Sequence, residues 1–273
     1  MALPMNDQQK HTLPRRLFLR TLGAVLPVGV TTLAYGGGTG LHAQTVVDAQ
    51  DLERINEILR DSKPHIWVFT GDSITHGAKH TAGRRSYPEI FEERLRWELT
   101  RTRDWVINTG ISSQTTASIL QDFQWRVSRF EPSVVSIMIG TNDCSKPDIT
   151  PAVFEKNLTS IIEQIRALNA VPVLHTPNPI ILNLSPERKT LPDYVTVIRQ
   201  VADSRKVLLV DNYEYWEKRQ SKFLNDIYRQ WLNDRLHPNY VGHQQIARLL
   251  FKTLNIFDAE APTCGGEYFE GQH

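Results

Sequence analysis

The chain has 273 residues and a formal net charge of +1, and residues 44–273 alone carry −2. Such a balance gives no basic footprint, so we do not expect nucleic acid as a partner. No segment after the first forty residues is apolar for long enough to cross a membrane. The roughly 230 residues beyond position 43 suit one domain with a sizeable core.

The first 43 residues have the three-part layout of an export signal. Basic residues lead into an apolar stretch over 21–35, and a small, polar run follows. Residues 15–20 resemble the twin-arginine signal, with Arg15 and Arg16 as its arginine pair and Pro14 as a minor departure. The alternatives are a membrane anchor, for which about 15 apolar residues are short, and a disordered basic arm. We expect a signal peptide cut after Ala43 and the twin-arginine export machinery as a partner.

Five compact apolar runs predict strands. They cover residues 66–69, 105–107, 134–139, 171–174 and 207–210. Nearly continuous apolar strands are typical of a parallel sheet that is covered on both faces.

Amphipathic patterns separate these runs. The clearest extends from Phe154 to Leu168, with Thr150 and Pro151 as its N-cap and first-turn proline. Weaker versions cover 86–99, 116–127, 193–202 and 241–254. The alternation predicts a doubly wound α/β sheet with right-handed crossovers. We expect one domain over 44–258 and a polar tail over 259–273 that adds little to the core.

Small and polar residues follow each predicted strand. They are 71–73 (Gly-Asp-Ser), 108–110 (Asn-Thr-Gly), 140–143 (Gly-Thr-Asn-Asp), 175–177 (His-Thr-Pro) and 211–212 (Asp-Asn). In open α/β sheets, ligands bind at the carboxyl ends of the strands, near the switch in strand order. The sequence therefore predicts a site at that edge of the sheet.

Four blocks together resemble the SGNH (GDSL-type) hydrolase family. They are residues 68–75, 108–110, 140–143 and the Asp-x-x-His motif at 234–237, and they follow one another in the order found in the family. The resemblance implies a three-layer α/β/α sandwich with a five-stranded parallel sheet, of the flavodoxin-like type. It also implies hydrolysis without a metal or an organic cofactor.

The resemblance makes Ser73 the nucleophile of a triad with Asp234 and His237. It builds the oxyanion hole from the amides of Ser73 and Gly110 and the carboxamide of Asn142. Each role is chemically sound, because a serine hydroxyl is a weak nucleophile until a base accepts its proton. A carboxylate three residues before the histidine can reach its other ring nitrogen. Losing one oxyanion donor typically costs on the order of 10²–10³ in rate.

Each block also has a structural interpretation. Gly-Asp-Ser after a strand is a common turn with an N-cap, Asn142 could cap the next helix, and Gly110 could serve a tight turn. An Asp-x-x-His motif often occurs by chance. Four such coincidences in the family's order favour the catalytic interpretation.

Several other residues have weaker claims. His76 and His80 are four apart, as metal ligands on a helix can be, but Gly77 between them and the lack of a third ligand favour a loop. We expect His175 to be a hydrogen-bonded structural residue and Asp143 to orient Asn142 or the first loop.

The cysteines and the late aromatic residues leave alternatives open. Cys144 and Cys264 could pair in an oxidising compartment, or Cys144 could be buried and the tail thiol free. Aromatic residues near the last block could stack on sugars, although helical core packing is the default. These residues are Tyr213, Tyr215, Trp216, Trp231 and Tyr240.

These features predict an exported serine esterase, periplasmic or secreted, that acts through an acyl-enzyme. The export signal, the family's frequent use on O-acetylated sugars and the lack of an obvious lipid-binding segment favour a carbohydrate O-acetylesterase acting on an O-acetylated glycan. The same catalytic set serves lysophospholipases, thioesterases and arylesterases, since a triad does not encode the acyl group or the alcohol. A non-catalytic glycan-binding protein is the alternative from another class.

Overall fold

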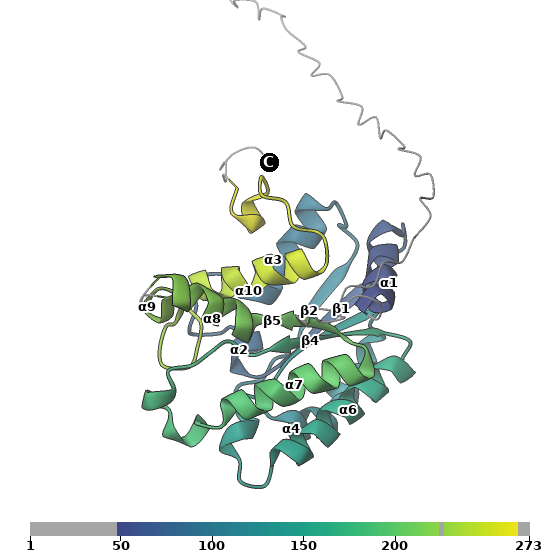
Figure 1. Ribbon diagram of the computed structural model, residues 1–273. Helices are drawn as coiled ribbons and strands as arrows, with labels where there is room; N and C mark the ends of the chain where they lie inside the picture. Colours follow the sequence, from purple (N-terminus) through teal and green to yellow (C-terminus); the bar gives the residue numbers. More distant parts are fainter. Residues whose placement is uncertain (1–47, 224–226, 267–273) are drawn as a thin grey trace, which may run out of the picture. The chain divides into compact units, whose positions relative to one another are not determined.

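In this computed structural model the chain is described over residues 48–223 and 227–266 (Figure 1). The predicted signal peptide over 1–43 lies outside the described residues. Five strands form one sheet within the described part: β1 (Ile66–Gly71), β2 (Trp105–Asn108), β3 (Val134–Met138), β4 (Val171–Thr176) and β5 (Leu208–Asp211). Each predicted apolar run lies within one of these strands or overlaps it, so the strand predictions are confirmed.

All neighbouring strands run parallel, in the order β2-β1-β3-β4-β5. The chain moves from β1 outward to β2 and then crosses back to β3 on the other side of β1. The strand order therefore switches between β1 and β3, and the loops after these two strands meet at the point where such sheets bind ligands.

The described residues form ten α-helices, which precede, connect and follow the strands. They are α1 (Asp48–Arg60), α2 (Ser73–His76), α3 (Tyr87–Glu93), α4 (Thr116–Gln121), α5 (Phe123–Arg126), α6 (Pro151–Ala167), α7 (Leu191–Arg205), α8 (Asn212–Phe223), α9 (Ile227–Trp231) and α10 (Tyr240–Thr253). A π-helical turn over Arg94–Glu98 extends α3. Short 3₁₀ turns cover Ser128–Phe130, Asp143–Ser145, Leu182–Leu184, Pro186–Arg188 and Pro262–Cys264.

The helices form a layer on each face of the sheet, as Figure 1 shows. Helices α4, α6 and α7 cover one face, and α1, α3, α8 and α10 cover the other. The fold is thus the three-layer α/β/α sandwich with a five-stranded parallel sheet that the sequence predicts.

Helix α6 shows how local signals set an element. It begins at Pro151, and the hydroxyl of Thr150 accepts a hydrogen bond from the Val153 amide, as an N-cap does. Its buried residues Phe154, Leu158, Ile161, Ile162 and Ile165 keep the predicted spacing. The pattern over 116–127 instead forms two short helices that meet at Asp122, and α1, α8 and α9 were not predicted.

Each face of the sheet buries its own hydrophobic cluster. On β3, Val135 and Ile137 pack with α4, α6 and α7, whereas Val134 and Met138 pack with α1, α3 and α10. Successive side chains of a strand point to opposite faces, so both sets must be apolar when both faces are covered. All five residues of β3 are buried, which explains why the run is continuous.

The end of the chain corrects one expectation and settles another. Ala261 and Cys264 are buried in the cluster that contains α3 and α10, so the tail from 259 onward contributes to the core as far as Cys264. Cys144 and Cys264 are both free and both buried. They do not pair, so the second alternative, a buried Cys144 and a free thiol at Cys264, is the one found.

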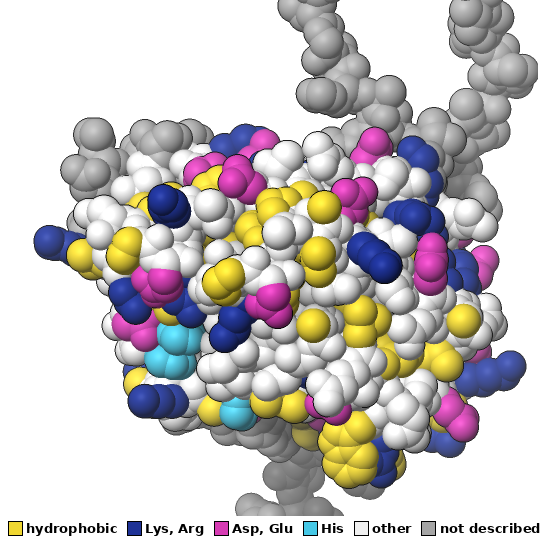
Figure 2. All heavy atoms as spheres, turned by 90° about the horizontal axis from the view of Figure 1, so that it is seen from below, with side chains coloured by type: hydrophobic (Ala, Val, Ile, Leu, Met, Phe, Trp, Pro, Cys, Tyr) yellow, Lys and Arg dark blue, Asp and Glu magenta, His cyan; other side chains and the backbone are white. Residues whose placement is uncertain are grey.

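No helix in the described ranges is long and apolar enough to cross a bilayer. On the face seen in Figure 2, basic and acidic side chains are interspersed rather than gathered by sign. That distribution agrees with the small net charge and offers no continuous basic stripe on this face.

Candidate active site

Ser73 is placed by the turn that joins β1 to α2. Asp72 caps the helix, because its Oδ1 accepts a hydrogen bond from the Ile74 amide at 2.9 Å. Gly71 leaves room for the turn, since a Cβ there would lie 2.3 Å from the carbonyl oxygen of Met138. Ser73 therefore stands at the start of α2, at the carboxyl end of β1.

His237 and Asp234 come from the loop between α9 and α10. Ser73 Oγ lies 2.9 Å from His237 Nε2, and His237 Nδ1 lies 2.8 Å from Asp234 Oδ2. Asp234 Oδ1 also accepts the amides of Leu236 at 2.7 Å and His237 at 2.8 Å, which closes a tight turn. The structure brings the three side chains of the expected triad into one hydrogen-bonded chain.

The charge of Asp234 follows from these contacts. Partial burial favours its neutral form, but hydrogen bonds from the amides of His237 and Leu236 and from the His237 ring outweigh it and lower the pKa of Asp234. An ionised carboxylate at Nδ1 keeps the proton of a neutral imidazole on that nitrogen. Nε2 is then free to accept a proton from Ser73.

Two of the three expected oxyanion donors have a loosely engaged N–H group. Ser73 is the first residue of α2, where amides have no partner within the helix. The carboxamide Nδ2 of Asn142 lies 3.1 Å from the carbonyl oxygen of Gln114 but 3.5 Å from Asp72 Oδ2. The second contact is at the limit of a hydrogen bond, so that N–H can turn to a ligand at small cost.

Gly110 is placed differently from the other two expected donors. Its amide donates to Asn108 Oδ1 at 2.9 Å, and Asn108 Nδ2 donates to the carbonyl oxygen of Thr75 at 2.8 Å. A Cβ at position 110 would lie 2.5 Å from the backbone nitrogen of His76. The sequence predicts close approach of a ligand at Gly110, but the close neighbour is the backbone of α2. Oxyanion binding here would require the amide to be shared with Asn108.

Two buried ionisable residues adjoin the turn that carries the nucleophile. Asp72 is 1% exposed, and burial raises its pKa to about 7, an effect that Asp143 increases and Arg188 and Arg126 oppose. Arg126 is also buried, and its Nη2 donates to the carbonyl oxygen of Gly71 at 2.6 Å. The base of the site thus combines groups whose burial disfavours charge.

Asp143 holds a loop rather than Asn142 or the first loop. Its Oδ1 accepts hydrogen bonds from the amide of Thr116 at 2.8 Å and from the Thr116 hydroxyl at 2.6 Å. These bonds join the end of β3 to the start of α4. The expected orienting role of Asp143 is therefore corrected.

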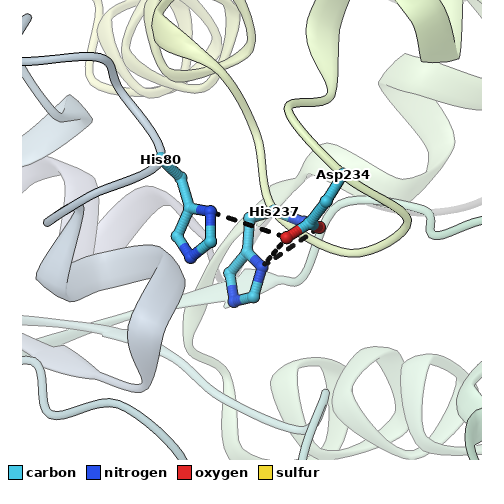
Figure 3. A group of neighbouring side chains, drawn as sticks. All are labelled: His80, Asp234 and His237. Carbon is cyan, nitrogen blue, oxygen red and sulfur yellow. Dashed lines mark hydrogen bonds and ion pairs between the residues drawn. The ribbon is translucent and has the colours of Figure 1, made fainter.

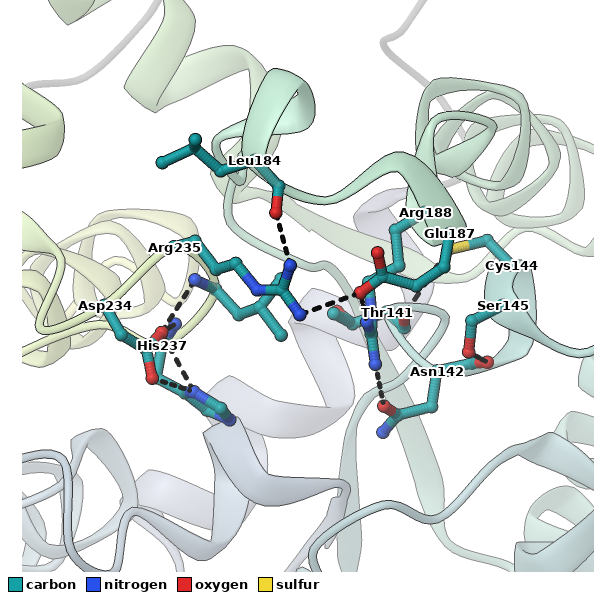
Figure 4. Close-up of polar contacts among 11 residues, drawn as sticks. Thr141, Asn142, Cys144, Ser145, Leu184, Glu187, Arg188, Asp234, Arg235 and His237 are labelled. Atoms are coloured by element: carbon teal, nitrogen blue, oxygen red, sulfur yellow. Dashed lines mark hydrogen bonds and ion pairs between the residues drawn. The ribbon is translucent and has the colours of Figure 1, made fainter.

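The loop between β4 and α7 adds contacts that the sequence did not reveal (Figure 4). Arg188 donates to the Thr141 carbonyl oxygen at 3.0 Å and to Asn142 Oδ1 at 3.3 Å. Glu187 pairs with Arg188 and, at 3.1 Å, with Arg235, the neighbour of Asp234 in the chain. Because a guanidinium only donates, Arg188 holds the oxygen of Asn142 and directs Nδ2 away from itself.

His80 lies in the turn after α2 and stacks on His237. The ring centroids are 3.7 Å apart, the planes differ by 4°, and His80 Nδ1 lies 3.5 Å from Asp234 Oδ2 (Figure 3). The three residues offer possible metal ligands within 4.8 Å of one another. The lone pairs of stacked rings lie in separate parallel planes, however, so one ion cannot lie in both planes. His76 ends α2 and contacts Ser112 at 3.3 Å, so the loop interpretation is confirmed for His80 but wrong for His76.

Among the remaining candidates, His175, Trp216 and Trp231 are structural, whereas Tyr240 is exposed. His175 is buried, its Nε2 lies 2.9 Å from Ser136 Oγ, and burial lowers its pKa to about 3. Trp216 and Trp231 pack edge to face at 5.0 Å in the core. Tyr240, at the start of α10, is 39% exposed.

Comparison with known proteins extends this description. The model of the GDSL-like lipase/acylhydrolase family matches residues 69–245, a span that includes all of the predicted catalytic and oxyanion residues. An acetylxylan esterase from Geobacillus stearothermophilus is 30% identical over 162 residues, which cover 55% of this chain and 72% of that enzyme. The crystal structure of Axe2, an acetylxylan esterase from the same organism, superposes with a TM-score of 0.60 at 25% identity, over 70% of this chain and 94% of the other. An uncharacterised protein from Mycoplasma pneumoniae is 31% identical over 140 residues, or 48% of this chain, but the match spans only 15% of that protein.

Proposed function

The chain belongs to the GDSL-like lipase/acylhydrolase family, and we propose on this premise that it is an esterase that removes acetyl groups from an O-acetylated carbohydrate. Ser73 is the proposed nucleophile, His237 the base and Asp234 the carboxylate that orients the base. The observation that carries the proposal is the chain of contacts from Ser73 Oγ to His237 Nε2 at 2.9 Å and from His237 Nδ1 to Asp234 Oδ2 at 2.8 Å. At the coarser level, the chain is a carboxylic ester hydrolase.

The first half of the proposed reaction forms an acyl-enzyme. Ser73 Oγ attacks the carbonyl carbon of the acetyl ester while its proton passes to His237 Nε2. The resulting tetrahedral intermediate collapses when the bond from the carbon to the sugar oxygen breaks. His237 returns the proton to that oxygen, and the sugar leaves as an alcohol.

The second half releases acetate. A water molecule attacks the acetyl carbon on Ser73 as it gives a proton to His237 Nε2. Collapse of the second intermediate breaks the bond to Ser73 Oγ, which takes back the proton from His237. Through both halves Asp234 stabilises the imidazolium, for which its lowered pKa keeps it ionised.

The oxyanion of each intermediate needs fixed donors. The Ser73 amide and the Asn142 Nδ2 group supply two, and Arg188 holds the Asn142 oxygen so that Nδ2 keeps its direction. Gly110 supplies a third, with its amide shared between the oxyanion and Asn108 Oδ1. Such preorganised donors act where charge develops, so they lower the barrier more than they strengthen substrate binding.

The choice of an acetylated carbohydrate rests on similarity. The acetylxylan esterase from Geobacillus stearothermophilus is 30% identical, and Axe2 shares the fold and the sheet that place the site. The triad itself does not select the acyl group or the alcohol. A lipid esterase, an arylesterase and a glycan-binding protein are therefore outcomes that the experiments below separate.

The first experiment tests the triad. Turnover of p-nitrophenyl acetate is measured for the purified protein, for Ser73→Ala and His237→Ala, and for the control Ser204→Ala on the exposed surface of α7. We expect kcat to fall by roughly 10⁴–10⁶ in the first two variants and to stay unchanged in the control. Near-normal activity in Ser73→Ala would refute the proposed nucleophile. Absence of turnover in the folded wild-type protein, with glycan binding that survives Ser73→Ala, would favour a binding protein.

The second experiment tests the substrate. The kcat/KM values for p-nitrophenyl esters from acetyl to dodecanoyl are compared, followed by acetate release from acetylated xylan, pectin, peptidoglycan fragments and sialic acids. We expect the acetyl ester to be preferred and one of these glycans to be deacetylated. A preference for the long acyl chains would replace the carbohydrate esterase with a lipid esterase.

We also propose that the enzyme is exported, because residues 15–20 resemble the twin-arginine signal. A periplasmic or secreted location would place the enzyme where extracellular glycans are found.

A further inference from the structure

We propose that His80 is a positioning residue for the base, His237. The ring of His80 covers one face of the His237 ring. While His80 is neutral, it leaves Asp234 Oδ2 available to accept the hydrogen bond from His237. This inference rests on the proposed function. It is carried by the stacked geometry of the two rings and by the hydrogen-bond partners of His80.

The stack restricts how His237 can move. The two rings are parallel within 4° at 3.7 Å, and their side chains are only 16% and 18% exposed. Turning the His237 ring about its Cβ–Cγ bond would drive its edge into the His80 ring. His80 therefore helps to keep Nε2 directed at Ser73, although it touches neither Ser73 nor the substrate's reacting atoms.

The hydrogen bonds of His80 define its neutral form. Asn233 Nδ2 lies 3.2 Å from His80 Nδ1. A carboxamide nitrogen only donates, so with Asn233 in this orientation Nδ1 is the acceptor and the ring proton lies on Nε2. In that state Nδ1 has no proton to offer Asp234 Oδ2, 3.5 Å away, and Oδ2 stays available to His237 Nδ1.

A proton on His80 Nδ1 would turn this nitrogen from a hydrogen-bond acceptor into a donor. The new N–H would donate to Asp234 Oδ2, which is also the closer acceptor for His237. A positive ring would then lie parallel to the ring that must become an imidazolium during catalysis, and two like charges at this separation repel. Protonated His80 should therefore slow both halves of the reaction.

Burial and the charged neighbours of His80 set the pH at which it gains this proton. Partial burial lowers the pKa of His80, His237 and Lys79 lower it further, and Asp234 opposes them. His243 on α10 also faces the pair, but burial lowers its own pKa to about 3, so it stays neutral. His80 is thus neutral around neutral pH and gains its proton in the acid range, where His237 must also stay unprotonated to act as a base.

The experiment compares His80→Ala, which removes the stack, with His80→Phe, which keeps a flat ring but cannot titrate. Ser204→Ala on the exposed surface of α7 is the control, because it changes neither the stack nor a charge beside it. The kcat and KM for p-nitrophenyl acetate are measured between about pH 5 and 8, together with the Tm of each variant. We expect His80→Ala to lower kcat roughly tenfold with little change in KM. We expect His80→Phe to restore most of this kcat, and Ser204→Ala to match the wild type.

The pH profile separates positioning from a merely structural role. In the wild type, the plot of log kcat/KM against pH should steepen toward two units per pH unit on the acid side. In His80→Phe it should keep the slope of one proton. The inference is wrong if His80→Ala keeps the wild-type kcat and slope, or if the two variants lose activity only in step with a lower Tm. If wild-type turnover does not depend on Ser73, the proposed function fails instead, whatever the His80 variants do.

Discussion

Asp72 meets two opposing demands at the nucleophile turn. As the N-cap of α2 it accepts the Ile74 amide, which favours the charged carboxylate. Its burial favours the neutral form and raises its pKa to about 7. Between pH 3.8, the ordinary pKa of the group, and about pH 7, the folded protein holds a proton that the unfolded chain has lost. The free energy of unfolding therefore falls as the pH rises through this window.

The variant Asp72→Asn should remove this penalty while keeping an oxygen for the Ile74 amide. At about pH 8 we expect it to unfold with a free energy higher than that of the wild type, by up to about 4 kcal/mol. The gain should shrink as the pH falls toward about 4. Urea unfolding at about pH 5 and about pH 8 measures the difference.

Asp203→Asn is the control for this prediction, because its carboxylate on α7 is 86% exposed. An Asp72→Asn variant that is no more stable at about pH 8 than at about pH 5, relative to the wild type, would contradict the prediction. Asp72→Asn should also weaken the contact with Asn142 Nδ2, so a gain in stability can accompany a loss in activity.

At the scale of elements, the site depends on loops that touch one another. The loop after β2 lies against α2 through Gly110, and the loop after β3 is tied to α4 by Asp143. The loop before α7 contacts the loop after β3 through Arg188 and Thr141, and it contacts the loop before α10 through Glu187 and Arg235. Parallel strands end at one edge of a sheet, so loops far apart in sequence are packed together there.

Gly110→Ala tests the contact between the β2 loop and α2. The added methyl group would lie 2.5 Å from the His76 nitrogen, so the loop must move away from α2. We expect kcat for p-nitrophenyl acetate to fall by roughly tenfold, less than the roughly 10²–10³ that the loss of a fully aligned oxyanion donor costs, because the Gly110 amide is shared with Asn108. Steady-state kinetics and the Tm are measured together.

Thr150→Ala is the matched control for Gly110→Ala. It removes the N-cap of α6, which should lower stability by about 1 kcal/mol, but it leaves the contact between the β2 loop and α2 intact. If Thr150→Ala reduces kcat as much as Gly110→Ala, the loss reflects general instability and the argument for the β2 loop is wrong.

At the scale of the whole molecule, the sheet and its two clusters explain where the site lies. The described part of the chain buries apolar residues on both faces of the sheet, and the residues of the candidate site lie in loops beyond the strands. The strand order switches between β1 and β3, so Ser73 and Asn142 lie on neighbouring loops. His237 reaches them from the loop before α10.

The predicted signal peptide is tested on the full chain. Removing residues 1–43 should leave kcat and Tm unchanged, because α1 begins at Asp48 and the site residues all follow it. Changing both Arg15 and Arg16 to Lys should keep the precursor inside the cytoplasm, measured by fractionation of the producing bacterium. Normal export of the double variant would refute the twin-arginine assignment.

The sequence alone predicted the class of fold and the five strands, and its resemblance to a family named the residues of the candidate triad. Continuous apolar runs occur where a strand is buried on both faces, and the strongest helix pattern, at α6, carries its own N-cap. Both signals are local, so they can be read without the structure. The weaker pattern over 116–127 did not predict the break at Asp122, and α1, α8 and α9 were missed.

Only the tertiary structure decided how the site is held together. The pairing of Arg188 with Asn142, the stack of His80 on His237 and the hydrogen bond from Gly110 to Asn108 depend on where separate loops meet or on how one loop turns. The burial that raises the pKa of Asp72 is likewise a property of the packed molecule. Such contacts leave no periodic signal in the chain, because each depends on distances that exist only after the sheet has brought its loops together.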